Sequence, residues 1–387
     1  MDYYQNFRAQ LEAKEKEQNK RSIKVYEPID AVRVKRNNRE FLMMASNNYL
    51  GLTHDLRVQQ AAKYAVEEYG TGSGGARLTS GTFPLFNELE LGIADFKHTE
   101  QALVFNTGYM ANVGTITALM NKNSIIISDE LNHASIIDGC RLSGARIERY
   151  NHKDIEHAEH ILKNYKSSHK MIITDGVFSM DGDIAPLDRL YELSKEYNAL
   201  LMVDDAHATG VIGNGRGTAH HFGLTDVDVQ LGTLSKALGS VGGYVAGRKE
   251  LIEYLINYSR SFIFSTALSP ADIGAALEAL RIVRDEPSVV DTLRDNTVYM
   301  AHKLQAMGID CDDETPIFPI VVGENDRALT LARELEERGI IITAIRPPTI
   351  PVGESRLRMT VTAAHSKEQL DYAAQSLHEL LVDMNIH

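Results

Sequence analysis

The fold is decided by the stretch from residue 170 to residue 207. Two apolar runs, K-M-I-I-T-D-G-V-F (170–178) and A-L-L-M-V-D-D-A-H (199–207), flank a helical pattern from Pro186 to Asn198. The same alternation extends upstream to S-I-I-I-S-D (124–129) and downstream to V-D-V-Q-L-G (227–232). Strands and helices that alternate in this way predict an α/β fold, in which a mostly parallel central sheet carries helices on both faces.

Polar residues follow the carboxyl ends of the predicted strands. They are Thr107-Gly108, Asn132-His133, Ser179, Asp204 with His207, and Thr233 with Lys236. A single loop lysine is usually a surface residue, so no one of these positions is informative alone. The carboxyl ends of parallel strands, however, lie at one edge of the sheet, where α/β proteins bind ligands. Five sets of polar residues at this edge therefore predict a functional site.

The first of these strand ends suits a phosphate group. A short strand, Q-A-L-V-F-N (101–106), meets Thr107-Gly108 and then a helix from Tyr109 to about Met120. Free backbone N–H groups and the positive end of the helix dipole favour an anion at such a turn. Ordinary loops between strands and helices have the same form, so the motif gains weight only from its neighbours.

Lys236 points to a particular cofactor. A lysine with a neutral amine is a nucleophile and can form a Schiff base with an aldehyde. A phosphate site, a lysine, an aspartate and two histidines together predict pyridoxal 5′-phosphate (PLP). Asp204 would pair with the ring nitrogen, His207 would hydrogen-bond the ring oxygen, and His133 would stack on the ring.

Two other ligand classes are less well supported. The run G-T-G-S-G-G (70–75) contains the G-x-G-x-x-G pattern of nicotinamide oxidoreductases, but it follows a predicted helix (57–69) instead of a strand. We expect a flexible or ligand-covering loop there. Arg77 is a candidate functional residue in this loop, but a solvated cation is the preferred interpretation. Asp204, Asp205 and His207 are possible metal ligands, but no second histidine stands at a metal-site spacing, so we expect no metal.

Composition restricts the partners and the compartment. The chain has 387 residues and a formal net charge of −13, which disfavours nucleic acid. Cys140 and Cys311 lie far apart and form no C-x-x-C motif. No apolar run is long enough to span a membrane, and the charged N-terminus does not resemble a signal peptide. We therefore expect a cytoplasmic protein with no membrane partner.

The chain is expected to contain three parts. Residues 1–45 form an N-terminal helix and strand segment, residues 46–285 a large cofactor-binding domain, and residues 286–387 a small α+β domain. A strand in the small domain carries Arg356 and Arg358, which stand two residues apart and so point to one face. The run I-I-I-T-A-I (340–345) is expected to be a single strand.

Several motifs, spread over nearly the whole chain, resemble one enzyme family. They are S-N-N-Y-L-G-L (46–52), S-D-E-L-N-H-A-S (128–135), T-D-G-V-F-S-M-D-G-D-I-A-P-L (174–187), V-D-D-A-H-A-T-G (203–210) and G-T-L-S-K-A-L-G (232–239). These runs resemble the α-oxoamine synthases, which are PLP enzymes of fold type I. The resemblance implies condensation of an amino acid with an acyl thioester and release of carbon dioxide.

The resemblance also implies roles for individual residues. Lys236 would hold the cofactor and later remove the Cα proton of the amino acid, while Asp204, His207 and His133 would hold the ring. The other implied cofactor-binding positions are Thr107, Gly108, Tyr109, Ser179 and Thr233, together with Ser265 and Thr266, which would reach the phosphate site of a second subunit. The implied substrate-binding positions are Arg21 for a distal carboxylate, Arg358 for the amino-acid carboxylate, and Asn47 and Thr349.

The substrates follow from a segment of the small domain. T-A-I-R-P-P-T-I-P-V-G-E-S-R-L-R (343–358) resembles the biotin-pathway member, which joins L-alanine to a pimeloyl thioester, more than it resembles the glycine-using members. A homodimer with the active site at the subunit interface is implied. Coenzyme A and acyl carrier protein remain alternative acyl carriers. G-A-R-L-T-S (75–80) departs from the family pattern, which leaves open how this loop covers the thioester.

Three alternatives remain. Glycine with a short acyl donor, as in a glycine C-acetyltransferase, would be a different reaction of the same family. A non-catalytic subunit would lack the lysine, whereas Lys236 is present. A nicotinamide oxidoreductase has only the weak glycine pattern in its favour.

Overall fold

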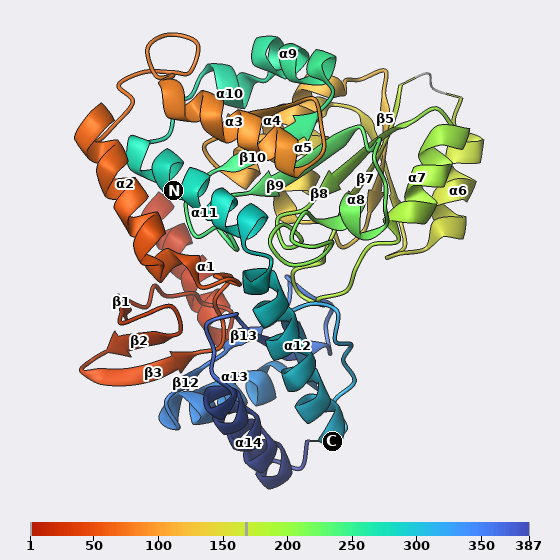
Figure 1. Cartoon of the computed structure of the whole chain (residues 1–387). Coiled ribbons are helices and arrows are strands. Elements are labelled where there is room, and N and C mark those ends of the chain that lie inside the picture. Colours follow the sequence, from red (N-terminus) through yellow and green to blue (C-terminus); the bar gives the residue numbers. More distant parts are fainter. Residues whose placement is uncertain (1, 167–168, 387) are drawn as a thin grey trace. The chain divides into compact units, whose positions relative to one another are not determined.

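The structure is a computed structural model that describes residues 2–166 and 169–386. It divides into two compact units, one of Asn47–Asp295 and the other of Met1–Ser46 together with Asn296–His387 (Figure 1). Within the described ranges, no helix is both long enough and apolar enough to cross a membrane.

A seven-stranded sheet forms the centre of the larger unit, in the order β4-β10-β9-β8-β7-β5-β6. The strands are β4 (Gln101–Phe105), β5 (Ile125–Asp129), β6 (Arg146–Tyr150), β7 (Lys170–Asp175), β8 (Leu200–Asp204), β9 (Val229–Thr233) and β10 (Gly243–Gly247). Only β10 is antiparallel to its neighbours β4 and β9, so the other six strands run in one direction. The predicted mostly parallel α/β sheet is thus confirmed.

Helices cover both faces of this sheet (Figure 1). Side chains alternate along a strand, so Ile126 of β5 packs in one apolar cluster while Ile125 and Ile127 pack in another. The first cluster includes residues of α4 (Gly108–Leu119), α5 (Ala134–Ser143), α9 (Lys249–Tyr258) and α10 (Arg260–Ile263). The second includes residues of α6 (Ile155–Asn164), α7 (Leu187–Glu196) and α8 (Thr218–His221).

Three further helices belong to the larger unit and pack side by side. They are α2 (Leu56–Tyr69), α3 (Pro84–Phe96) and α11 (Pro270–Asp285). Gly274 of α11 faces Ala65 of α2 so closely that a Cβ at position 274 would lie 2.7 Å from the Ala65 Cβ. A short 3-10 turn, η1 (Leu52–His54), precedes α2.

The smaller unit contains two sheets with the strand orders β1-β2-β3-β12 and β11-β14-β13. The strands are β1 (Glu27–Pro28), β2 (Arg33–Arg36), β3 (Arg39–Met43), β11 (Ile317–Gly323), β12 (Ile340–Ile341), β13 (Thr343–Ile345) and β14 (Ser355–Thr360). The helices are α1 (Tyr3–Lys16), α13 (Asn325–Glu337) and α14 (Lys367–Asp383), and α12 (Ser288–Ala306) begins at the end of the larger unit.

The single strand expected at 340–345 is wrong. Ile340 and Ile341 pair in parallel with β3, whereas Thr343–Ile345 pairs antiparallel with β14. The run therefore contributes to two sheets. An apolar run shows that a segment is buried but not which strand it pairs with, so the break after Ile341 left no trace in the pattern.

Candidate active site

The start of α4 and the end of β9 form one corner of the site. Thr107 caps α4, since its Oγ1 accepts a hydrogen bond from the Met110 N–H at 3.1 Å. The N–H groups of Gly108 and Tyr109 lie in the first helical turn, where backbone donors have no acceptor within the helix. A Cβ at Gly108 would lie 3.5 Å from the Thr233 Cβ, so Thr233 stands against this turn.

Two glycine contacts and two hydroxyl groups complete this corner. A Cβ at Gly243 would lie 2.6 Å from both the Gly108 nitrogen and the Thr107 oxygen, so only glycine fits at position 243. The Thr233 hydroxyl donates to the Gly242 oxygen at 2.8 Å, and its Oγ1 lies 2.7 Å from the Ser235 Oγ. The structure thus brings Thr107, Gly108, Tyr109 and Thr233 together, and Ser235, a residue that was not predicted, joins them.

Asp204 stands buried at the end of β8. Its Oδ2 accepts a hydrogen bond from Asn112 Nδ2 at 2.6 Å, and its Oδ1 accepts one from the Ala206 N–H at 2.9 Å. Burial raises the pKa of Asp204, although the Asn112 hydrogen bond and the charge of Lys236 act in the opposite direction. A cationic ring nitrogen beside this carboxylate would therefore be strongly favoured.

Asp175 is a second buried carboxyl group, at the end of the neighbouring strand β7. Its Oδ2 accepts a hydrogen bond from the backbone N–H of His133 at 2.7 Å. Burial, together with the charge of Asp204, raises the pKa of Asp175 well above its usual value. Asp175 was not predicted. It stands at the carboxyl end of its strand in the same way as Asp204, and this position could have identified it.

His133 caps the next helix, α5. Its Nδ1 lies 2.7 Å from the Ser135 Oγ and accepts a weaker hydrogen bond from the Ser135 N–H at 3.3 Å. Burial lowers the pKa of His133, the charge of Asp204 opposes this effect, and the charge of Lys236 adds to it. His133 is therefore neutral near pH 7, and it stands within the electrostatic reach of both Asp204 and Lys236.

Lys236 is half-buried in the connection between β9 and β10. Its positive charge lowers the pKa of Asp175, Asp204 and His133, which places the amine close to all three groups. The connection is held by its own backbone, because the Leu234 N–H donates to the Gly242 oxygen and the Ser240 N–H to the Leu234 oxygen. The structure thus brings together Lys236, Asp204 and His133, which were predicted from their positions after the strands.

His207 is buried three residues beyond β8 and has a partner that was not predicted. The Tyr49 hydroxyl lies 2.7 Å from the His207 Nδ1 and donates to the Asn47 Oδ1 at 3.2 Å. Tyr49 is fully buried. It stands in the S-N-N-Y-L-G-L run, where only Asn47 had been given a role, and the link to His207 spans 158 positions that no local pattern connects.

Ser179 lies in the turn that follows β7, and His152 braces this turn. The His152 ring bridges two carboxylates, with Nδ1 at 3.0 Å from the Asp129 Oδ1 and Nε2 at 2.8 Å from the Asp183 Oδ2. The ring also meets the edge of Phe178 at 4.4 Å between centroids. His152 therefore ties the loop that leads to His133 to the turn that carries Ser179.

The second aspartate of the D-D-A-H run has a structural partner. Lys97 Nζ lies 2.6 Å from the Asp205 Oδ2, and both side chains are completely buried. Burial alone would lower the pKa of Lys97, but the charge of Asp205 raises it above the usual value. Asp205 also accepts a hydrogen bond from the Thr218 N–H at 3.1 Å.

The expectation that Arg77 is a solvated cation is wrong. Its side chain is 8% exposed and donates two hydrogen bonds to Glu90, at 2.9 and 3.0 Å. Its guanidinium also lies 3.9 Å from the centre of the Phe86 ring. Glu90 and Phe86 belong to α3, so the helix that follows the loop supplies both the counter-charge and the aromatic face.

Ser265 and Thr266 lie beside the glycine-rich loop. The Ala267 N–H donates to the Gly75 oxygen at 2.9 Å, and the Asn106 side-chain amide donates to the Thr266 oxygen at 2.6 Å. Thr266 is exposed and Ser265 half-buried. Their expected contact with the phosphate of a second subunit stays a prediction.

Two of the expected substrate-binding residues line one cavity of the smaller unit. Arg21 and Thr349 share a space of about 590 Å³ with Lys14, Lys20 and Arg346. Burial and the nearby charge of Arg21 lower the pKa of Arg346. This cavity is therefore rich in cations, and Arg346 is a member that the sequence did not single out.

Arg358 is buried in β14, where it stands opposite Thr343, a residue that lines this cavity. Its neighbour Arg356 is buried as well and pairs with the Glu354 carboxylate at 2.9 Å. The expected role of Arg358 in binding an amino-acid carboxylate stays a prediction.

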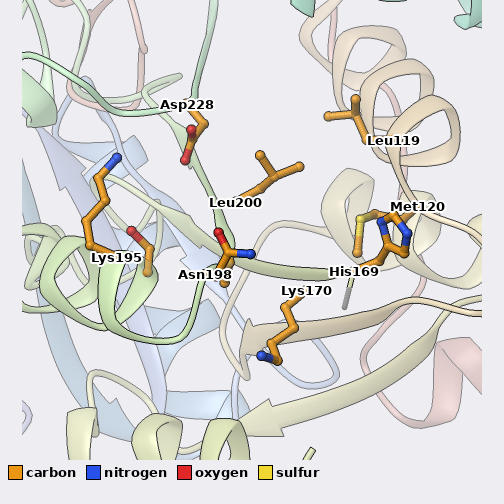
Figure 2. Close-up of a pocket in the computed structure, with 10 residues that line it drawn as sticks. Leu119, Met120, His169, Lys170, Lys195, Asn198, Leu200 and Asp228 are labelled. Atoms are coloured by element: carbon orange, nitrogen blue, oxygen red, sulfur yellow. The ribbon is translucent and has the colours of Figure 1, made fainter. Parts of the chain in front are cut away.

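A separate cavity of about 370 Å³ lies at the opposite edge of the central sheet. Figure 2 shows its lining, which includes Lys170, Leu200 and Asp228. These residues stand at the amino ends of β7, β8 and β9, whereas the predicted site uses the carboxyl ends. The cavity is thus not part of the candidate active site.

Comparison with known proteins identifies the family. A family model described as aminotransferase class I and II matches residues 39–377. The chain belongs to this family and, within it, to the α-oxoamine synthases that its motifs resemble. It is 47% identical over 384 residues to the 8-amino-7-oxononanoate synthase of Lysinibacillus sphaericus, covering 98% of this chain and 99% of that protein.

Solved structures show the same fold. A structure of SPT (serine palmitoyltransferase) with its PLP internal aldimine has a TM-score of 0.95 at 29% identity and covers 100% of both chains. The 8-amino-7-oxononanoate synthase of Francisella tularensis has a TM-score of 0.77 at 28% identity and covers 89% of this chain and 99% of that one. The fold type I architecture expected from the motifs is thereby confirmed.

Proposed function

We propose that this protein is a PLP-dependent acyltransferase that joins L-alanine to a pimeloyl thioester. The products are 8-amino-7-oxononanoate, carbon dioxide and the free thiol carrier, as in biotin biosynthesis. The observation that carries the reaction class is the gathering of Asp204, Asp175 and His133 around the charge of Lys236. The choice of substrates rests on the 47% identity to a named 8-amino-7-oxononanoate synthase.

The residues of the large unit fit the cofactor. The N–H groups of Gly108 and Tyr109 at the start of α4, with the Thr107 hydroxyl, suit a phosphate group. The Thr233 hydroxyl would join them by turning its hydrogen away from the Gly242 oxygen. Burial raises the pKa of Asp204, and a pyridinium nitrogen beside this carboxylate would favour its charged form. When bound, PLP supplies an electron-poor ring that stabilises negative charge at the substrate Cα.

Three side chains carry the chemical steps. Lys236 holds the cofactor between turnovers and then takes the Cα proton of alanine on Nζ. His133 would stack on the ring and donate a hydrogen bond to the thioester carbonyl, where negative charge develops. The carbon–carbon bond forms as the carbon–sulfur bond breaks, the thiol leaves, and loss of the original carboxylate as carbon dioxide is followed by return of a proton to Cα. His207 and Ser179 would hold the ring oxygen.

The ends of the substrates are assigned to arginines. Arg358 binds the alanine carboxylate, for which a planar guanidinium is suited. Arg21 binds the distal carboxylate of the pimeloyl chain, supported by its place in a cation-rich cavity with Thr349. Asn47 borders the substrate next to His207, to which Tyr49 connects it.

The proposal includes a homodimer in the cytoplasm. Thr266 is exposed to solvent, so its side chain is accessible to a second subunit. The backbone next to it is held by the hydrogen bond from the Ala267 N–H to the Gly75 oxygen of the glycine-rich loop. Ser265 and Thr266 would there reach the phosphate of the second subunit's cofactor.

A comparison of substrate pairs tests the proposal. The purified protein, loaded with PLP, is assayed with L-alanine and pimeloyl-coenzyme A, and with L-alanine and pimeloyl-acyl carrier protein. Glycine with acetyl-coenzyme A and L-serine with palmitoyl-coenzyme A are run in parallel. We expect the highest kcat/KM with one of the pimeloyl pairs. A preference for either of the other pairs would overturn the proposed function.

A further inference from the structure

A chain of hydrogen bonds connects Asp204 to His133 through two buried residues. Asn112 Nδ2 lies 2.6 Å from the Asp204 Oδ2 and 2.9 Å from the Ser135 Oγ. The Ser135 Oγ lies 2.7 Å from the His133 Nδ1. Asn112 and Ser135 are each 1% exposed and belong to α4 and α5. This chain of hydrogen bonds therefore runs through the protein interior between Asp204, which is expected to pair with the nitrogen of the cofactor ring, and His133, which is expected to stack on that ring.

The Asp204 end of this chain decides which group donates in each hydrogen bond. Asn112 turns its NH₂ group toward the Asp204 Oδ2, which accepts the hydrogen bond, as a carboxylate paired with a ring cation must. The same NH₂ group has a second hydrogen, which it donates to the Ser135 Oγ. The Ser135 hydroxyl then keeps its single hydrogen for its other neighbour, the His133 Nδ1.

The position of the hydrogen on the His133 ring follows from these donors. Nδ1 receives the hydroxyl hydrogen of Ser135, and the Ser135 backbone N–H also points at it, at 3.3 Å. An Nδ1 that accepts twice does not carry a hydrogen of its own. Burial holds the pKa of His133 low, so the ring is neutral and its one hydrogen sits on Nε2.

We propose that Asn112 and Ser135 are positioning residues that hold His133 in its Nε2–H tautomer while they orient the Asp204 carboxylate. The proposal deepens the proposed function and rests on it for the use of the tautomer, since His133 needs a hydrogen on Nε2 in order to donate to the thioester carbonyl. Neither residue has to touch a substrate. They act through Asp204, which would contact the cofactor, and through His133, which would contact the thioester.

Nitrogen NMR of the PLP-loaded protein tests the tautomer. Protein labelled with ¹⁵N in its histidines is compared with a His133→Asn variant, which identifies the His133 signals. We expect a protonated Nε2 and an unprotonated Nδ1 in the unaltered protein. A hydrogen on Nδ1 would overturn the proposal without any variant, whichever substrates the enzyme uses.

Ser135→Ala tests the hydroxyl. We expect the Nδ1–H tautomer of His133 to become populated and kcat to fall about tenfold with little change in KM, because a hydrogen bond to a reacting group is lost. Ser143→Ala is the matched control, since this hydroxyl of the same helix bonds the Cys140 oxygen instead. Ser135→Thr, which keeps the hydroxyl, is expected to keep the tautomer. An unchanged tautomer in Ser135→Ala contradicts the proposal.

Asn112→Ala tests the other end of the chain. Loss of the amide leaves the Asp204 Oδ2 without its donor, so we expect about tenfold weaker binding of PLP to the cofactor-free protein, measured by absorbance titration. Thr117→Val on the same helix removes a hydroxyl that bonds only to backbone oxygens, and is expected to bind PLP normally. PLP affinity equal to that of the unaltered protein would show that Asn112 does not orient Asp204.

Discussion

The Lys97 amine lies 2.6 Å from the Asp205 carboxylate, and neither side chain is exposed at all. Asp204, which ends β8, and Asp205, which follows it, therefore have separate tasks. Asp205 is neutralised inside the protein and also holds the Thr218 N–H. Asp204, its neighbour in sequence, keeps its carboxylate for Asn112 and the candidate active site.

Breaking the Lys97–Asp205 pair will destabilise the large unit. Lys97→Met leaves a buried carboxylate without a counter-charge, which costs about 3–5 kcal/mol. Adding Asp205→Asn removes that charge and keeps an acceptor for Thr218, so the double variant is expected to be more stable than Lys97→Met alone. Urea unfolding midpoints measure both. Lys249→Met, which removes an exposed ion pair with Glu253, should shift the midpoint little.

His152 makes stability depend on pH. Burial would lower its pKa, but the hydrogen bonds and charges of Asp129 and Asp183 raise it from 6.5 to about 9. A raised pKa means that the stabilisation is complete below about pH 6.5 and is lost as the pH rises through about 9. A shift of this size corresponds to at most about 3 kcal/mol.

The effect of His152 is measured as a difference between proteins. We expect unfolding midpoints of the unaltered protein to fall between pH 6.5 and about 9 by more than those of His152→Asn, whose side chain does not titrate. His160→Asn changes an exposed histidine and serves as the control. The same fall in all three proteins would show that other groups are responsible.

Tyr49→Phe removes the hydroxyl that lies against the His207 Nδ1. The ring of His207 then loses a partner that fixes its orientation, and we expect kcat/KM to fall about tenfold. Tyr258→Phe, on the exposed side of α9, is expected to behave like the unaltered protein. Unchanged kinetics in Tyr49→Phe would mean that His207 is held by other contacts.

Arg21 and Arg346 are expected to select a charged acyl chain. Arg21→Ala and Arg346→Ala each remove a cation from the same cavity, so KM for the pimeloyl thioester should rise about tenfold or more. A heptanoyl thioester has the same chain length without the distal carboxylate and provides the control substrate. Equal increases in KM for both thioesters would argue against a carboxylate site.

Lys236→Ala removes the nucleophilic amine and should abolish turnover. The phosphate corner at Gly108 and Thr233 is left intact, so we expect the variant still to bind PLP, detected by its absorbance. Borohydride treatment followed by mass spectrometry should show no covalent cofactor in the variant. Lys249→Ala, at the exposed start of α9, is the control, and residual full activity in Lys236→Ala would refute the mechanism.

The central sheet could be predicted because its strands are nearly continuous apolar runs. Such runs as Ile125–Ile127 are buried on both faces and cannot be confused with loops. The strand β10 escaped prediction because it begins in a glycine-rich segment at Gly243. Its place between β4 and β9 depends on pairing, which no local pattern records.

The predicted site contained the groups that stand directly after strands, and missed those that support them. Asn112 looks like an ordinary polar residue of a helix, and Tyr49 like an ordinary core aromatic. Each acquires its meaning from a partner far along the chain, at Asp204 and His207. Arg77 was misjudged for the same reason, since Glu90 and Phe86 shield it from solvent only once α3 is in place.

Strand pairing holds the two ends of the connection that carries Lys236 next to each other, because Thr233 of β9 stands opposite Gly243 of β10. Gly239 adopts a left-handed φ of 62°, and a side chain there would meet the backbone of Thr53 at 2.8 Å. The Lys236 amine therefore reaches its partners by rotation of the lysine side chain, while the backbone of the connection keeps its conformation. Laboratory evolution toward new acyl donors should accordingly leave the length of residues 234–242 untouched, because an insertion there would displace the nucleophile while the Thr233–Gly243 pairing stayed in place.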